Sequence, residues 1–75
     1  MSVEDYKRDY QAFADKFLSA RAEDFDDWRD FEEEFYEFLN RNTLLTPARY
    51  GVTEEQANTI DQEVRSKTIE KFMEG

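Results

Sequence analysis

Large hydrophobic residues recur every three or four positions over the first part of the chain, which is the spacing of one face of an α-helix. The residues on this face are Val3, Tyr6, Tyr10, Phe13 and Phe17, with Ala14 and Leu18 beside them. Ser2 stands at the cap position of such a helix, and Asp5, three residues later, completes a capping-box pattern. The pattern predicts a helix over about residues 3–20 with its aromatic face in the core.

A second helical pattern covers about residues 25–41 and separates aromatic from acidic residues. At about 100° per residue, one side of this helix holds Trp28, Phe31, Phe35, Phe38 and Leu39. The opposite side holds only carboxylates, namely Asp26, Asp27, Asp30, Glu33, Glu34 and Glu37. We expect the aromatic side to supply the core and the acidic side to face solvent. For Trp28 two positions stay open, in the core or on an exposed binding face.

The two helical patterns share one phase, and neither Gly nor Pro separates them. One continuous helix is therefore an alternative, although its hydrophobic stripe would then need a partner chain to cover it. A break near residues 20–24 is favoured, because Arg21 and Asp24 would fall on the stripe. Asp24, followed by Asp27, is also a reasonable N-cap for the second helix.

The third helix is predicted over about residues 53–73, after a loop that holds Pro47 and Gly51. Asn40 and Asn42 are plausible stop residues for the helix before this loop. The hydrophobic loop residues Leu44, Leu45 and Tyr50 indicate that the loop packs across the bundle. Thr53 and Gln56 form a capping-box pattern, and a thin apolar stripe follows at Ala57, Ile60, Val64, Thr68 and Phe72.

Ile69 and Met73 lie off this stripe and, with Phe72, are predicted to form a small apolar patch near the end of the chain. Two interpretations of the patch stay open. The loop encloses it, or it is a contact with a partner or with a second copy of the chain.

These patterns predict an all-α protein, a small three-helix bundle that forms a single domain over residues 1–75. A chain of this size has a marginal core, which seven Phe, four Tyr and one Trp would help to fill. No apolar run approaches the ~18 residues of a membrane span, and the first residues lack the pattern of a signal peptide. We therefore expect a cytoplasmic protein.

The formal net charge of −9 is concentrated in one segment. Residues 23–37 hold nine acids and one base, whereas the other residues hold ten acids and nine bases. Like charges three or four residues apart on a helix repel by about 0.2–0.5 kcal/mol per pair. Adaptation to high salt would spread acids over the whole surface, so this local excess points instead to a use for the acidic side.

Few kinds of chemistry fit this composition. The chain has no His and no Cys, which removes the common nucleophile–base pairs and the zinc and haem sites built on those residues. Asp24, Asp26 and Asp30 lack the glycine of a calcium loop, and Glu34 with Glu37 lacks the second acidic pair of an E-x-x-E metal site. We expect no enzyme activity, no cofactor and no metal.

The leading hypothesis is a binding or inhibitor protein whose carboxylate face engages a basic surface of a nucleic-acid-binding protein, in the manner of a nucleic-acid mimic. In composition alone the chain resembles small acidic inhibitors of phages and mobile elements. Direct binding to nucleic acid or to an anionic membrane is not expected, because both repel an acidic protein. The alternative is a structural or regulatory interaction module or a homodimer that binds through apolar surfaces, with the acids serving solubility.

Overall fold

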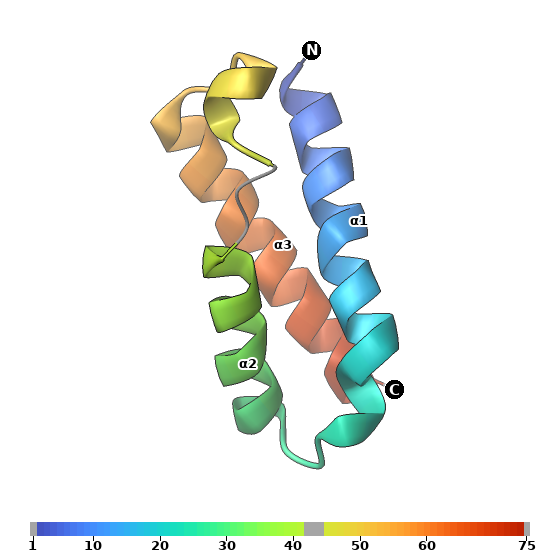
Figure 1. Ribbon diagram of the computed structural model, residues 1–75. Coiled ribbons are helices and arrows are strands. Elements are labelled where there is room, and N and C mark those ends of the chain that lie inside the picture. The colour runs from blue at the N-terminus through green and yellow to red at the C-terminus, as the bar shows by residue number, and fades with distance from the viewer. Residues whose placement is uncertain (1, 42–44, 75) are drawn as a thin grey trace.

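The computed structural model describes residues 2–41 and 45–74 and contains three helices, α1 (Val3–Arg21), α2 (Trp28–Asn40) and α3 (Glu54–Glu74). Two short 3₁₀ turns, η1 (Ala22–Asp24) and η2 (Pro47–Tyr50), lie in the connections. The helices pack side by side, with α3 against both α1 and α2 (Figure 1). No strand occurs in either described range. The predicted all-α three-helix bundle is confirmed.

The predicted starts of α1 and α3 are confirmed in atomic detail. The backbone N–H of Asp5 donates to Ser2 Oγ, and that of Ser2 donates to the Asp5 carboxylate, both at 3.2 Å. At α3 the backbone N–H of Gln56 donates to Thr53 Oγ1 at 3.1 Å, and that of Thr53 donates to Gln56 Oε1 at 3.0 Å. Each reciprocal pair satisfies N–H groups that have no partner within the helix.

The connection between α1 and α2 is a real break, so the continuous helix is wrong. Phe25 and Asp27 both have extended backbone, and α2 begins only at Trp28. The N-cap is Asp27, whose carboxylate accepts from the N–H of Arg29 at 3.0 Å. Asp24, the predicted cap, pairs instead with Arg21 at 2.7 Å. Phe25 explains the later start, because it turns back to pack edge-on against Phe31, with ring centroids 5.7 Å apart.

The core is a layer of aromatic rings between the helices. Phe17 of α1 lies 5.5 Å from Phe31 and 5.7 Å from Phe35 of α2, measured between ring centroids. Most residues of the three predicted stripes are buried. Trp28, for which the sequence left both the core and an exposed binding face open, is 39% exposed, because it begins α2 at the end of the bundle. Ile69, placed by the sequence in a small apolar patch, is only 8% exposed, on a stretch of α3 that contacts α1 through Thr68 and Lys71 and α2 through Phe72.

The segment before α3 closes the other end of the bundle, as the loop pattern predicts. Tyr50 and Val52 are buried, and the Tyr50 ring packs edge-on against Tyr6 with centroids 5.3 Å apart. Gly51 ends η2 with a left-handed φ of 68°, a conformation that costs glycine little. The expectations for Asn42 and Leu44 lie outside the described residues. None of the described helices combines the length and the hydrophobicity that a membrane crossing requires.

Candidate functional site

Four carboxylates of α2 form one exposed row, which we call the acidic face, made of Asp30, Glu33, Glu34 and Glu37. All four are exposed. At about 100° per residue they fall within an arc of about 100°, while Phe31 and Phe35 point to the opposite side and are 0% exposed. The helix thus uses one side to build the core and the other to present charge, as the sequence pattern predicts.

Asp26 and Asp27, predicted to lie on the same helix face, precede α2 in the turn. Both are exposed, but Asp27 is engaged as the N-cap. The helix N-terminus also stabilises nearby negative charge. Asp27 therefore has a structural reason to be acidic, whereas Asp26 has no hydrogen bond or ion pair within the described residues.

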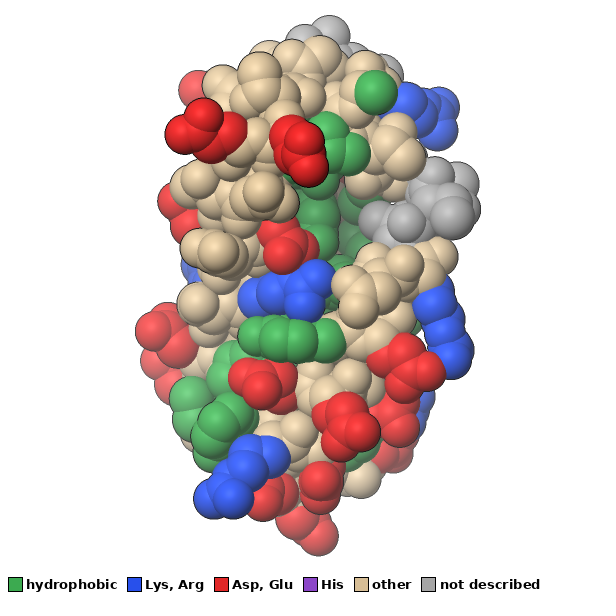
Figure 2. All heavy atoms as spheres, turned by 90° about the vertical axis from the view of Figure 1, so that its left-hand side faces the viewer, with side chains coloured by type: hydrophobic (Ala, Val, Ile, Leu, Met, Phe, Trp, Pro, Cys, Tyr) green, Lys and Arg blue, Asp and Glu red, His purple; other side chains and the backbone are tan. Residues whose placement is uncertain are grey.

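The acidic face is poorly neutralised. Glu37 pairs with Arg41, and both side chains are more than half exposed. Asp30, Glu33 and Glu34 form no ion pair within residues 2–41 and 45–74. Among the acids elsewhere, Asp5 and Asp9 pair with Arg8, Asp15 with Lys71, Asp24 with Arg21, Asp61 with Arg65 and Glu63 with Lys7. Other exposed acids form no ion pair within the described residues, but they are spread over α1 and α3; they include Glu4, Glu54, Glu55, Glu70 and Glu74. Figure 2 shows acidic side chains gathered on the lower half of the surface that it views.

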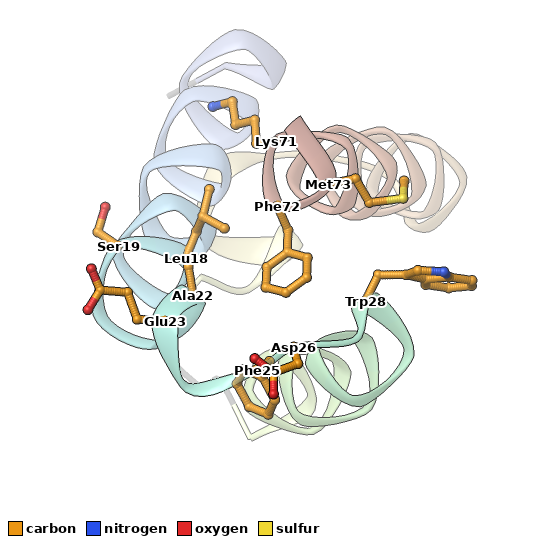
Figure 3. Close-up of a pocket in the computed structure, with 10 residues that line it drawn as sticks. All are labelled: Leu18, Ser19, Ala22, Glu23, Phe25, Asp26, Trp28, Lys71, Phe72 and Met73. Atoms are coloured by element: carbon orange, nitrogen blue, oxygen red, sulfur yellow. The ribbon is translucent and has the colours of Figure 1, made fainter. Parts of the chain in front are cut away.

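Beside this face lies a groove at the end of the bundle, where η1, the start of α2 and the end of α3 meet. Its volume is 730 Å³. Trp28 and Met73 stand together at one edge, and Phe72 projects between the helices (Figure 3). We call this the end groove; it is lined by Leu18, Ser19, Ala22, Glu23, Phe25, Asp26, Trp28, Lys71, Phe72 and Met73.

The hydrophobic side chains of the end groove differ from the predicted patch of Ile69, Phe72 and Met73 in one residue. Met73 is 57% exposed and Phe72 is partly buried, but Ile69 belongs to the core. Trp28 takes its place, and with Met73 it is one of the two large hydrophobic side chains exposed in the described part of the chain. The sequence pattern placed Trp28 on the aromatic stripe of the second helix and could not show that it lies beside the end of α3.

A polar cluster in the middle of the bundle joins all three helices. Tyr10 of α1 donates a hydrogen bond to Asp61 of α3, and Asp61 lies 2.8 Å from Nε of Arg65. The Arg65 guanidinium lies 4.3 Å from the ring centroid of Tyr36 and reaches Asn40, both of α2. Burial and the hydrogen bond to Asp61 raise the pKa of Tyr10 well above its usual value. The spacing of Asp61 and Arg65 indicates a helical ion pair, but the sequence gives no sign of the link to Tyr36.

A second polar contact links the segment before α3 to α1. The Tyr50 hydroxyl donates to Asp9 at 2.8 Å. This hydrogen bond and the one from Arg8 lower the pKa of Asp9, and the same bond to Asp9 raises the pKa of Tyr50. Both polar contacts tie helices together, and we assign them a structural role.

The acidic side chains of α2 lie in a row along the helix and do not surround a common point. In the described ranges, no three acidic side chains converge in a way that would hold a metal ion. Comparisons with protein-family models, with curated proteins and with solved structures give no match to this chain. The site must therefore be interpreted from its own geometry, which offers a charged row and an adjoining hydrophobic groove.

Proposed function

We propose that this protein is a non-enzymatic binding or inhibitor protein that captures a basic surface of a nucleic-acid-binding protein and occupies it in place of nucleic acid. One observation carries the proposal. Asp30, Glu33 and Glu34 stay exposed on one side of α2 without an ion pair in the described structure, although five bases pair with acids elsewhere, namely Lys7, Arg8, Arg21, Arg65 and Lys71. Such a row lowers the stability of α2 by repulsion, and binding to a basic partner would relieve that repulsion.

The spacing of the charges supports mimicry of nucleic acid. Asp30 and Glu37 are seven residues apart, which corresponds to about 10.5 Å along a helix. The acidic face therefore presents roughly one carboxylate per 3.5 Å, close to the ~3.4 Å between phosphates along one strand of duplex DNA. A groove lined by Lys and Arg would meet a similar density of negative charge on either ligand.

A pull-down with a matched pair of double variants tests the proposal. Glu33→Gln/Glu34→Gln removes two charges from the acidic face, and Glu54→Gln/Glu55→Gln removes two exposed charges from the start of α3. We expect the wild type and the α3 variant to retain a nucleic-acid-binding protein in about 0.1 M salt and to release it in about 0.5 M salt. DNA or RNA should also displace it, and the α2 variant should retain much less. Equal losses for the two variants would attribute binding to net charge and contradict the proposal.

A second candidate function is an interaction module or homodimer that uses the hydrophobic side chains of the end groove, with the acids serving solubility. The exposure of Trp28 and Met73 favours it. An apolar interface responds little to salt, whereas capture through charge weakens steeply. Retention of the same partner in high salt by the wild type and by Glu33→Gln/Glu34→Gln would support this second candidate.

A further inference from the structure

One part of the end groove is hydrophobic and rests on the core. The Phe72 ring stacks on Phe31, with ring centroids 4.3 Å apart, and Phe31 is completely buried. Trp28 and Met73 rise beside Phe72 and remain exposed (Figure 3). The groove volume of 730 Å³ falls in the range of about 300–1,000 Å³ typical of ligand pockets. An incoming hydrophobic side chain would therefore meet Phe72, which the core holds in place, beside the exposed side chains of Trp28 and Met73.

The charges around the groove select the kind of partner. Residues 21–30 hold five acids and two bases. One of these bases, Arg21, pairs with Asp24, and Lys71 on the rim pairs with Asp15 at 3.0 Å. Arg29, the second base of residues 21–30, lies 5.9 Å from the ring centroid of Trp28. Glu23 and Asp26 line the groove and have no ion pair with any described residue.

The helix dipoles act in the same direction. The carboxyl ends of α1 and α3 and the amino end of α2 lie at this end of the bundle (Figure 1). Two partial negative charges thus accompany one partial positive charge, and Asp27 already caps the latter. A second copy of the chain, with its own net charge of −9, would bring like charges together at this site.

We propose that the end groove holds a large hydrophobic side chain of the basic partner, carried on a segment whose flanking Lys or Arg residues face Glu23, Asp26 and the acidic face. The inference rests on the proposed function and gives it a source of specificity. A row of carboxylates attracts many basic surfaces, whereas a hydrophobic anchor in a desolvated pocket selects among them.

Three synthetic peptides of equal length test the groove: a lysine–leucine peptide, a lysine–serine peptide of the same charge, and a neutral glutamine–leucine peptide. Dye-labelled peptides are titrated by fluorescence polarisation against the wild type, Met73→Ser, Trp28→Ala and the control Ala12→Ser. Ala12 is an exposed apolar residue in the middle of α1, outside the end groove. Circular dichroism establishes that each variant is folded.

We expect the wild type to bind the lysine–leucine peptide about tenfold more tightly than either other peptide. Met73→Ser and Trp28→Ala should each weaken that binding severalfold without changing the lysine–serine affinity, and Ala12→Ser should change neither. Trp28 is the sole tryptophan, so its emission should shift only with the lysine–leucine peptide. Met73→Ser decides the question if Trp28→Ala fails to fold.

Other outcomes separate the two proposals. If both lysine peptides bind with equal affinity and Met73→Ser changes neither, the groove is no anchor and the inference is wrong, while charge capture stands. If the glutamine–leucine peptide binds as tightly as the lysine–leucine peptide, the groove prefers no basic segment and the inference is also wrong. If neither lysine peptide binds at low salt, the proposed function fails as well.

Discussion

Trp28 and Phe31 lie three residues apart on the same side of α2 but have different surroundings. Phe31 is fully buried, and its ring stacks on Phe35 and Phe72 with centroids 5.6 and 4.3 Å away. Trp28 occupies the first position of the helix, where the core ends, and is 39% exposed. The same chemical type therefore supports the fold at one position and lines a surface groove at the other.

This contrast predicts unequal effects on stability. Phe31→Ala should lower the free energy of unfolding by about 3–5 kcal/mol, the usual loss for a buried aromatic residue. Trp28→Ala should lower it by only about 1–2 kcal/mol, because much of the ring is already in water. Urea denaturation followed by circular dichroism measures both. Equal losses would show that Trp28 belongs to the core and would remove it from the proposed groove.

Tyr10 predicts how stability depends on alkaline pH. Its pKa is raised in the folded protein, so its hydroxyl contributes stability that is present below pH 10, the usual value, and is lost as the pH rises towards the folded pKa. The loss is about 1.4 kcal/mol per pH unit for one such group. Tyr10→Phe should cost about 1 kcal/mol at neutral pH.

The test is the difference in unfolding free energy between the wild type and Tyr10→Phe, measured by denaturant titration from pH 7 to pH 11. The difference should shrink above about pH 10, because only the wild type then loses the Tyr10 contribution. A difference that stays constant with pH would show that the pKa of Tyr10 is not raised in the folded protein.

At the scale of the element, one side of α2 stabilises the fold and the other side destabilises the helix. Its aromatic side is needed for the core, whereas its acidic side contains four like-charged pairs three or four residues apart, all of which involve Glu33 or Glu34. Asp30, by contrast, lies in the first turn, and Glu37 pairs with Arg41. The repulsion in this helix is therefore concentrated in two residues.

Glu33→Gln/Glu34→Gln should raise the free energy of unfolding by about 1 kcal/mol at low salt, since it removes all four repulsive pairs. Glu54→Gln/Glu55→Gln makes the same change in net charge but should lower stability, because both acids favour the N-terminus of α3. Thermal unfolding at low and at high salt measures these opposite effects, and salt should diminish both. A gain of equal size in the two variants would mean that only net charge matters.

The turn before α2 offers a second prediction at this scale. Asp27→Ala should lower the free energy of unfolding by about 1 kcal/mol, because it removes the N-cap. Asp26→Ala should leave stability nearly unchanged and weaken partner binding instead. Denaturation and binding measurements on the two variants separate these roles. If Asp26→Ala destabilises the fold as much as Asp27→Ala does, Asp26 is also structural.

The helices, their stripes and two of the caps could be predicted from the sequence because each depends on residues a few positions apart. The start of α2 could not, since both Asp24 and Asp27 fit the cap pattern and the packing of Phe25 on Phe31 favours the later one. The burial of Ile69 depends on how α1 and α2 lie against α3.

The candidate site could likewise be predicted from the sequence only in part. The exposure of Asp30, Glu33, Glu34 and Glu37 follows from helical periodicity and could be predicted. The end groove brings together residues 18–28 and 71–73, which only the fold places side by side. Its mixture of exposed Trp28 and Met73 with nearby carboxylates could therefore not be found from the sequence.

For the whole molecule, the decisive property is the uneven use of charge. Six ion pairs elsewhere in the described structure match acids with bases of α1 and α3. The acidic face and Asp26 are left with the single pair between Glu37 and Arg41. The central claim is that this unmatched charge attracts a basic surface that normally binds nucleic acid.

The most direct measurement is the affinity of the wild-type protein for its captured partner as a function of salt concentration, repeated with Glu33→Gln/Glu34→Gln. We expect the logarithm of the association constant to fall steeply with the logarithm of salt concentration, and the variant to bind more weakly with a shallower slope. Nucleic acid should compete with both. An affinity that hardly changes with salt, or an unchanged slope in the variant, would contradict the account.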